Sequence, residues 1–486
     1  MASETQPLSR RRSGVLLHLS SLPGPGLGGT LGSAAEHFIE FLVAGGFSVW
    51  QVLPLGPPHH DRSPYLAQSA FALDPALLSL EQMYADGWLD QRIDEGTSTI
   101  AGRRALRDAV LRAAPHLAGE FDAFRSRAAH WLTDYAMFCV IRNTVAGIPW
   151  WQWPEPLRDR DDDALRKIGA ENAAALEEVA FEQFLLDAQW RRLRSRAGER
   201  GVELFGDLPL FVAQDSADVW ANRSLFKLDE WGQPQVVAGV PPDYFSATGQ
   251  RWGNPQYDWE VHRKTGFEWW TRRVAHEIDR FDLLRIDHFR GLDAVWEIPA
   301  ESDTALQGCW VQVPGEALLS SLKRSLGPLP LVAEDLGLIS AAVLRLRDDF
   351  HLPGMRILQF AFDGGAANPY LPHNLVPDSV VYTGTHDNDT LRGWWESLAP
   401  HQQQNVADYL GCGLGRLPQE LVRTAFASVS LLSIVPMQDL LDLGADARMN
   451  LPGMAEGNWR WRFTWDQVPS DLSAQSLVLN TRYGRF

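Results

Sequence analysis

The segment VELFGDLPLFV, residues 202–212, shows the pattern that decides the fold. Its apolar run ends on a glycine and on Asp207, a carboxylate that gains nothing from a hydrophobic core. Continuous apolar runs predict strands that are buried on both faces, as in a parallel sheet covered by helices. Similar runs, usually followed by a helical pattern, lie at residues 14–24, 47–57, 281–291, 330–337, 354–363, 379–389 and 431–441. Strands that alternate with helices in this way predict an α/β fold, a (β/α)8 TIM barrel.

The spacing of the runs predicts where insertions interrupt the barrel. With 486 residues the chain is long enough for one large barrel or for several domains. It contains no short repeat and no low-complexity linker, so we expect one catalytic barrel over residues 13–464, with insertions at the carboxyl ends of its strands. We predict a largely helical insertion at 83–200, a loop-rich insertion at 213–275 and a solvated tail at 1–12.

The composition argues against several classes of partner. A net charge of −17 disfavours nucleic acid and anionic membrane surfaces, whereas neutral ligands are compatible with it. The scattered residues Cys139, Cys309 and Cys412 form no CxxC pair, which favours reduced thiols. The apolar run after the basic residues 10–12 is short and interrupted by His18, and no run approaches the roughly 20 residues of a transmembrane helix. We therefore expect a cytoplasmic protein.

No cofactor and no metal are predicted. GPGLGG, residues 24–29, fits the glycine pattern of a dinucleotide site, but the next apolar run ends without the acid that such a site needs. His276 and Glu277 do not begin an HExxH zinc motif, because position 280 is an arginine. His59 and His60 are interpreted as surface or loop residues.

Carboxylates end several of the expected strands. Asp207 ends the third strand, Asp287 the fourth and Glu334 the fifth, and Asp387 follows His386 at the end of the seventh. In barrels of this type the loops at the carboxyl ends of the strands carry the active site. A single acid in such a place is more often a helix cap or a loop acceptor. A group of them at one rim indicates a shared site.

The spacing of Arg285 and Asp287 adds an electrostatic argument. Residues two apart on a strand share a face, so the guanidinium should hold Asp287 ionised by lowering its pKa. Clustered carboxylates without a metal signature suit glycoside chemistry, in which a retaining enzyme places two acids about 5–5.5 Å apart. The 20 tryptophans, several of them in pairs, fit a sugar ligand, although core packing explains most single pairs.

Several segments along the chain also match one known family. They are SPYLAQSAFALDPALLSLE (63–81), GDLPLFVAQDSADVW (206–220), VAGVPPDYFSATGQRWGNPQYDW (237–259), RIDHFRG (285–291), AEDLG (333–337), YTGTHDNDT (382–390), RMNLPG (448–453) and GNWRWR (457–462). Together they resemble the 4-alpha-glucanotransferases, or amylomaltases. The resemblance implies an enzyme without a cofactor that cleaves an α-1,4 glucan through a covalent glucosyl-enzyme. It would transfer the glycosyl segment to the 4-hydroxyl of another glucan or of glucose.

The resemblance also implies a role for each strand-end residue. Asp287 would be the nucleophile, Glu334 the general acid/base, and Asp387 the residue that holds sugar hydroxyls and stabilises the transition state. Arg285 and His386 would support the nucleophile and the substrate. The other residues that the resemblance places around the sugars are Tyr65, by stacking, and Asp207, Asp243, Gln250, Trp252, His288 and Asn458.

One departure from the family bears on the length of the bound glucan. Where an aromatic sugar platform is expected, this chain has His60, within PPHHDR at 57–62.

The loop at 237–259 is expected to act as a lid that favours an acceptor sugar over water. Two alternatives remain. One is an α-1,4-glucan hydrolase, in which water intercepts the same intermediate. The other is a glucan-binding protein without activity, which should lack one of the three catalytic carboxylates.

Overall fold

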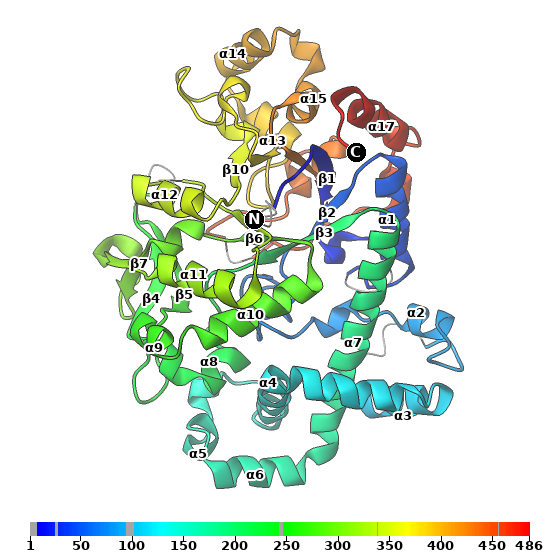
Figure 1. Cartoon of the computed structure of the whole chain (residues 1–486), viewed down its shortest axis with the longest axis vertical. Helices are drawn as coiled ribbons and strands as arrows, with labels where there is room; N and C mark the ends of the chain where they lie inside the picture. The colour runs from blue at the N-terminus through cyan, green and yellow to red at the C-terminus, as the bar shows by residue number, and fades with distance from the viewer. Residues whose placement is uncertain (1–6, 25–27, 94–101, 243–245, 338, 455) are drawn as a thin grey trace.

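Eight parallel strands form a closed barrel in the computed structural model, which describes residues 7–24, 28–93, 102–242, 246–337, 339–454 and 456–486. Around the barrel the strands follow the order β1-β12-β11-β10-β9-β6-β3-β2 (Figure 1). Their bounds are Arg12–Leu16 (β1), Val49–Gln51 (β2), Glu203–Leu208 (β3), Leu283–Ile286 (β6), Leu331–Ala333 (β9), Gly354–Ile357 (β10), Ser379–Tyr382 (β11) and Leu432–Pro436 (β12). Seven strands lie within the predicted runs and β1 begins two residues before its run, so the predicted TIM barrel is confirmed.

Close packing explains the glycine in VELFGDL. A Cβ atom on Gly206 would lie 2.4 Å from the ring of Phe281, which immediately precedes the segment of β6. Gly14 on β1 is restricted in the same way, because its Cβ would lie 2.4 Å from the carbonyl oxygen of Val49 on β2. Each strand sends at least one apolar side chain into the barrel interior: Leu16, Val49, Phe205, Leu283, Val332, Met355, Val380 and Leu432.

Amphipathic helices cover the outside of the barrel. On α1 the buried residues Ala35, Phe38, Ile39 and Leu42 recur at the spacing of one helix face. The helices of this layer are α1 (Ser33–Ala44), α7 (Ala173–Glu199), α10 (Glu268–Arg280), α11 (Gly315–Leu326), α12 (Ala341–Asp349), α13 (Leu391–Ser397), α14 (Pro400–Leu410), α15 (Gln419–Ala427), α16 (Met437–Leu440) and α17 (Leu472–Tyr483).

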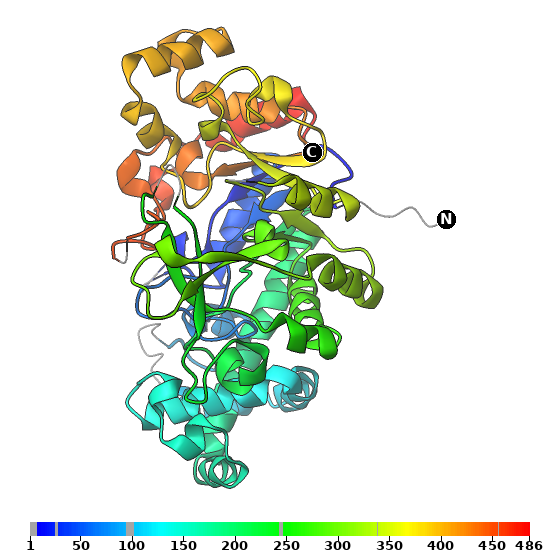
Figure 2. The ribbon, with the colours of Figure 1, turned by 90° about the vertical axis from the view of Figure 1, so that its left-hand side faces the viewer.

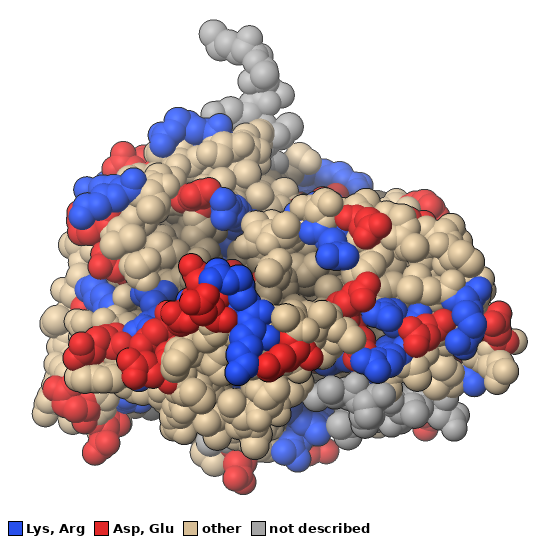
Figure 3. All heavy atoms as spheres, turned by 90° about the horizontal axis from the view of Figure 1, so that it is seen from below, with Lys and Arg blue, Asp and Glu red and all other residues tan. Residues whose placement is uncertain are grey.

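The long segment between β2 and β3 forms a group of helices at one side of the barrel (bottom of Figure 1). These are α2 (Leu80–Ala85), α3 (Arg103–Ala113), α4 (Leu117–Thr144), α5 (Glu155–Arg158), α6 (Asp162–Glu171) and the first part of α7. Helix α7 is 27 residues long, packs along α4 and continues to the barrel, where it contacts β3 and α1. Its Arg192 and Arg194 pair with Glu36 and Asp282 of the barrel at 2.7 and 2.9 Å. Seen from this side, acidic and basic side chains are interspersed (Figure 3).

The segment expected to be loop-rich, 213–275, contains two strands that the sequence did not predict. They are β4 (Val236–Val240) and β5 (Gln250–Pro255), and they form an antiparallel sheet with β7 (Ala294–Pro299) and β8 (Cys309–Gln312), in the order β5-β4-β7-β8. The short helices α8 (Ala217–Ala221) and α9 (Trp259–Lys264) lie in the same segment. The sheet lies beside the barrel (Figure 2). Its local pattern was hard to recognise because β7, a partner of β4, follows β6 in the sequence.

The two ends of the chain differ from the prediction. Leu8 is fully buried and Arg12 opens β1 and pairs with Glu203, so residues 8–12 are not a solvated tail. At the other end, α17 packs on α1 and α15, and Arg485 is fully buried, so the barrel unit does not end at residue 464. In the described parts of the chain no helix combines the length and the apolar character needed to cross a membrane.

Candidate active site

Strand alternation turns the predicted acids toward the barrel axis. Phe205 on β3, Leu283 on β6 and Val332 on β9 point into the interior cluster, while the residues after them pack against the helices. The inward face therefore recurs two residues later, at the mouth of the barrel. The residues at these positions are Asp207, Arg285 and Glu334, and Asp287 is the next inward residue after Arg285.

The strand register brings the same residues together. Asp207 is the direct neighbour of Arg285 across β3 and β6, and Ile286 pairs with Ala333 across β6 and β9. Asp287 and Glu334 are the next residues along these two neighbouring strands. The backbone amide of Glu334 donates to the carbonyl oxygen of Ile286 at 3.1 Å, which continues the ladder to the acid itself.

Arg285 connects two carboxylates in the floor of this mouth. Its Nη1 donates to both oxygens of Asp207 at 2.8 and 2.7 Å, and its Nη2 donates to Oδ1 of Asp287 at 2.8 Å. The side chain of Asp207 is 0% exposed. Asp207 was predicted to line a sugar site, and in the structure its carboxylate lies behind Arg285 as the buried counter-ion of that residue. The exposed fraction of the Asp287 side chain is 29%, so it is the open member of the group.

The pKa of Asp287 departs from the prediction. Burial raises it to about 6, and the carboxylates of Asp207 and Asp387 add to this effect, while Arg285 opposes it. Arg285 does not produce a net lowering of this pKa, because the effect of burial is larger than that of the guanidinium. Asp287 therefore keeps its charge at neutral pH but gains a proton in mild acid.

Glu334 is held by backbone amides and has the higher pKa of the two acids. His288 N–H donates to Oε2 at 2.7 Å and Leu336 N–H donates to Oε1 at 3.0 Å. His288 has a φ of 52°, in the left-handed region, and this backbone conformation aims its N–H at the acid. Burial raises the pKa of Glu334 to about 8, and the nearby charge of Asp287 contributes to the shift.

Asp387 lies on the loop that follows β11, and its pKa is lowered, whereas those of Asp287 and Glu334 are raised. Burial works against its charge, but His386 and Asn450 hold the pKa of Asp387 well below its usual range. Nε2 of His386 lies 3.3 Å from Oδ2, and Nδ2 of Asn450 donates to Oδ1 at 2.7 Å. The backbone carbonyl of Asp387 accepts a bond from Arg448 at 2.6 Å.

Tyr65 links the two sides of the mouth. Its ring is stacked on His386, with 5.2 Å between the ring centroids. Its hydroxyl donates to Oδ2 of Asp207 at 2.7 Å and lies 2.9 Å from Nε2 of His386. Because the hydroxyl proton goes to Asp207, the oxygen accepts from His386. Tyr65 is thus joined to Arg285 and to Asp387 through one intermediate residue on each side.

Trp252, Gln250 and His288 lie together on the other side of Glu334. Trp252 and Gln250 belong to β5, and Nε1 of Trp252 donates to Oε1 of Gln250 at 3.1 Å. The rings of Trp252 and His288 meet edge to face, with centroids 4.8 Å apart. Three predicted site residues are thus brought close to the acid. Asp243 lies outside the described residues.

Asn450 contacts the carboxylate of Asp387, whereas Asn458 was predicted to line the sugar sites. The side chain of Asn458 is bonded to the backbone of Leu451 and Met454, so it shapes its own loop. Asn450 is part of the RMNLPG segment that carried the resemblance, which was the signal available in the sequence. His60, at the departure, is exposed, and His59 beside it is half-buried.

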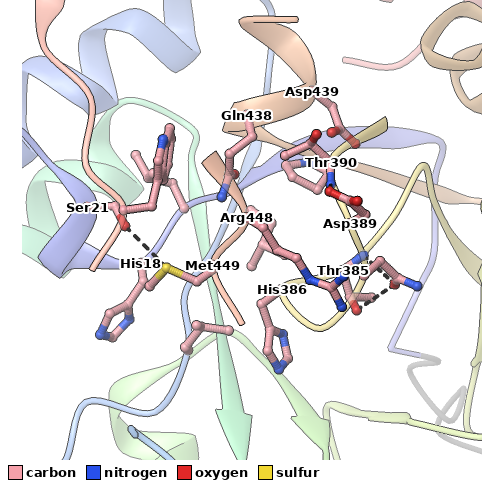
Figure 4. Close-up of a pocket in the computed structure, with 16 residues that line it drawn as sticks. His18, Ser21, Thr385, His386, Asp389, Thr390, Gln438, Asp439, Arg448 and Met449 are labelled. Atoms are coloured by element: carbon pink, nitrogen blue, oxygen red, sulfur yellow. Dashed lines mark hydrogen bonds between the residues drawn. The ribbon is translucent and has the colours of Figure 1, made fainter. Parts of the chain in front are cut away.

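Residues of the loop that bears His386 line a pocket of mixed polar and apolar character (Figure 4). The side chains that line it include His18, Thr385, Asp389, Gln438, Asp439 and Arg448. Within the described residues, no group of three or more histidine, cysteine, aspartate or glutamate side chains is arranged to hold a metal ion. The arrangement at the mouth is a set of acids with different pKa values, flanked by aromatic rings.

Relatives of the chain cover nearly its whole length. A family model described as 4-alpha-glucanotransferase matches residues 17–467. The 4-alpha-glucanotransferase of Thermus thermophilus is 46% identical over an alignment that covers 96% of each chain. The chloroplastic/amyloplastic enzyme of the same name from Solanum tuberosum is 41% identical, over 99% of this chain and 87% of its own.

Two solved amylomaltase structures resemble this chain in fold. An amylomaltase from Streptococcus agalactiae, in complex with acarbose, is 34% identical and matches with a TM-score of 0.92 over 98% of this chain and 100% of its own. An amylomaltase from Corynebacterium glutamicum shares the fold, with a TM-score of 0.75 at 18% identity, over 98% of this chain and 75% of its own. The chain therefore belongs to the 4-alpha-glucanotransferase family.

Proposed function

We propose that this 4-alpha-glucanotransferase uses a retaining double displacement with Asp287 as nucleophile and Glu334 as general acid/base. The observation that carries the proposal is the difference in protonation between two neighbouring acids. A pKa of about 6 leaves Asp287 ionised at pH 7, and a pKa of about 8 keeps Glu334 protonated. Two acids whose surroundings push their pKa values apart suit a nucleophile and a proton donor in glycoside chemistry.

In the first step an oxygen of Asp287 attacks the anomeric carbon of an α-1,4-linked glucose unit. The bond from this carbon to the glycosidic oxygen breaks, and Glu334 gives its proton to that oxygen, which leaves as a free 4-hydroxyl. Arg285 keeps Asp287 oriented through Oδ1. The product is a β-linked glucosyl-enzyme and an ionised Glu334.

In the second step a 4-hydroxyl of another glucan, or of glucose, takes the place of the leaving group. Glu334 removes its proton, the acceptor oxygen attacks the anomeric carbon, and the bond to Asp287 breaks. Two inversions restore the α-linkage, and both acids return to their starting protonation. The positions of Gln250 and Trp252 beside His288 support an acceptor on this side of Glu334.

Asp387 supplies fixed negative charge on the other side. Because its pKa lies well below the usual range, the carboxylate stays ionised while positive charge develops at the anomeric carbon. It also accepts bonds from sugar hydroxyls, and the stacked rings of Tyr65 and His386 provide a flat surface beside it. The acarbose carried by the similar amylomaltase supports an oligosaccharide in this mouth.

Incubation with maltotriose tests the transferase against its two alternatives. A transferase yields glucose together with maltopentaose and longer chains, because each released segment is passed to another maltotriose. A hydrolase yields glucose and maltose alone, and a glucan-binding protein without activity yields neither. We expect glucose together with a series of longer maltooligosaccharides. Proton NMR should show that the newly formed linkages keep the α-configuration.

A further inference from the structure

The three catalytic acids are attached to the barrel in different ways. Asp287 and Glu334 each follow directly on the last residue of a strand, so β6 and β9 fix their positions. Asp387 lies five residues beyond the end of β11 and four residues before the start of α13. A ladder of strand hydrogen bonds does not reach it. Something else must hold the segment 383–391, which we name the β11–α13 loop.

Asp439 contacts both ends of the β11–α13 loop. This residue lies on α16, which begins where β12 ends, and it is 2% exposed. Its Oδ2 accepts a bond from the hydroxyl of Thr383 at 2.6 Å, at the start of the loop. Its Oδ1 accepts a bond from the backbone amide of Leu391 at 2.7 Å, at the end of the loop. One buried carboxylate therefore closes the base of the loop.

The rest of the loop makes further contacts between these two ends. Oδ1 of Asn388 accepts bonds from the amide and the hydroxyl of Thr385, both at 2.9 Å, and makes a tight turn next to Asp387. The carbonyl oxygens of His386 and Asp387 accept bonds from Asn450 and Arg448 at the top of the loop. Figure 4 shows Asp439 beside Thr390, on the pocket that also borders His386.

A role of Asp439 in capping helix α13 alone does not explain these contacts. The cap of α13 is already made by Thr390, whose side chain accepts a bond from the amide of Gly393 at 3.0 Å. Only one oxygen of Asp439 lies at the helix, and the other reaches back to the strand end at Thr383. The two bonds together fix the distance between the ends of the loop.

We propose that Asp439 is a positioning residue for transfer, which sets the place of Asp387 by fixing both ends of the β11–α13 loop through Thr383 and Leu391. It touches no substrate and acts through the loop. The inference rests on the proposed role of Asp387. A shift of about 1 Å in a catalytic group costs on the order of a hundredfold in rate, so the loss of one of these bonds should be visible in kcat.

The matched variants Thr383→Val and Thr383→Ser test this proposal. Valine keeps the shape of threonine but removes the hydroxyl, whereas serine keeps the hydroxyl. We expect Thr383→Val to lower kcat for maltotriose disproportionation by at least about tenfold with KM changed less than about threefold. Thr383→Ser should return kcat to within about twofold of the parent. An unchanged kcat in Thr383→Val, or an equal loss in Thr383→Ser, would overturn the proposal.

A double-mutant cycle shows whether the effect passes through Asp387. Release of fluoride from α-glucosyl fluoride is measured for Asp387→Asn with and without Thr383→Val. We expect the valine to cost nothing further once Asp387 is changed, because the two losses share one cause. Additive losses would overturn the proposal. If Asp387→Asn itself were nearly as active as the parent, the proposed role of Asp387 would fail, whatever Thr383 does.

Asp439→Ala gives an independent measurement. Alanine removes both carboxylate oxygens, so neither the Thr383 hydroxyl nor the Leu391 amide keeps its acceptor. We expect a loss of kcat at least as large as in Thr383→Val, with a melting temperature that shows a folded protein at the assay temperature. A folded Asp439→Ala protein with the parent's kcat would overturn the proposal.

Discussion

Arg285 and Arg485 are both buried, but they lie at opposite ends of the barrel and have different partners. At the mouth, Arg285 binds the carboxylates of Asp207 and Asp287, and against the effect of burial these charges raise its pKa well above the usual value. At the other end, Arg485 donates to backbone carbonyl oxygens, including those of Arg12 and Phe426, and burial lowers its pKa to about 9.

This difference separates the residues of catalysis from those of stability. At the mouth, burial together with neighbouring carboxylates raises the pKa of Asp287 to about 6 and that of Glu334 to about 8. At the other end, Arg485 ties the beginnings of β1 and β12 to the end of α15 through backbone carbonyl oxygens, and among the described residues it pairs with no carboxylate there. Substitutions at the mouth should therefore change kcat more than the free energy of unfolding. Substitutions at the other end should change the free energy of unfolding more than kcat.

The largest effect is expected for the acids at the mouth. Asp287→Asn and Glu334→Gln should each lower kcat/KM for maltotriose by about 10³-fold or more, because one removes the proposed nucleophile and the other the proposed proton donor. Initial rates and thermal unfolding are measured together. The melting temperature should stay within a few degrees of the parent, since neither acid packs the core. A loss of less than tenfold would remove the residue from its assigned role.

Asp335 is the matched control, because it is next to Glu334 in the sequence but has a structural environment. Its side chain is 2% exposed and pairs with Arg347 and Arg356. Breaking a buried ion pair of this kind costs about 3–5 kcal/mol of unfolding free energy. Asp335→Asn should therefore lower the melting temperature and leave the rate per folded molecule near that of the parent.

The next effect concerns the opposite end of the barrel. Arg485→Met should lower the free energy of unfolding by about 3 kcal/mol, because several buried carbonyl oxygens lose a charged donor. Its kcat should stay within about twofold of the parent. The control is Arg482→Met, an exposed arginine on the same helix end, for which a change of only about 0.5 kcal/mol is expected. Equal destabilisation by both variants would contradict a specific clamp at Arg485.

Local sequence patterns predicted the mouth better than the contacts that support it. Apolar runs that end in an acid are visible in the sequence, and strand alternation then places Asp287 and Glu334 on one face. The partners of these acids come from distant segments. Asn450 contacts Asp387 across 63 positions and Asp439 contacts Thr383 across 56, and no periodicity in the sequence indicates such pairs.

The buried ion pair of Asp207 was not predicted, for a related reason. The sequence shows that the acid ends a strand, but not that Arg285 on the next strand covers it. Arg485 was missed because its partners are backbone carbonyl groups, which every residue has. The strands β4 and β5 were missed because their sheet is completed by residues more than forty positions away, beyond β6.

The pH dependence of the rate is a smaller effect that belongs to the mouth alone. The pKa of about 6 for Asp287 and of about 8 for Glu334 predict that kcat/KM for maltotriose falls below the first value and above the second. The acid limb arises because Asp287 must be ionised to attack, and the alkaline limb because Glu334 must carry a proton. With α-glucosyl fluoride the leaving group needs no proton, so the alkaline limb should disappear from the first step. An alkaline limb that is the same with both donors would contradict the assignment of Glu334.

The smallest effect is expected at Trp252, on the acceptor side of Glu334. Trp252 is half-buried, meets the ring of His288 edge to face and donates to Gln250, so its indole borders the space beside the acid that His288 holds. An acceptor sugar that stacks there gains about 1 kcal/mol, and water in the same place gains nothing from the ring.

Trp252→Ala should therefore lower the ratio of transfer to hydrolysis by about fivefold, which is the rate equivalent of about 1 kcal/mol of stacking. The products from maltotriose shift toward glucose and maltose, and a reducing-end assay combined with chromatography of the oligosaccharides measures both reactions. Trp231→Ala is the control, because Trp231 is 55% exposed and lies on a turn between β3 and β4. If transfer and hydrolysis fell in the same proportion, Trp252 would bind glucan without selecting the acceptor, and the preference for a sugar over water would have to come from another part of the mouth.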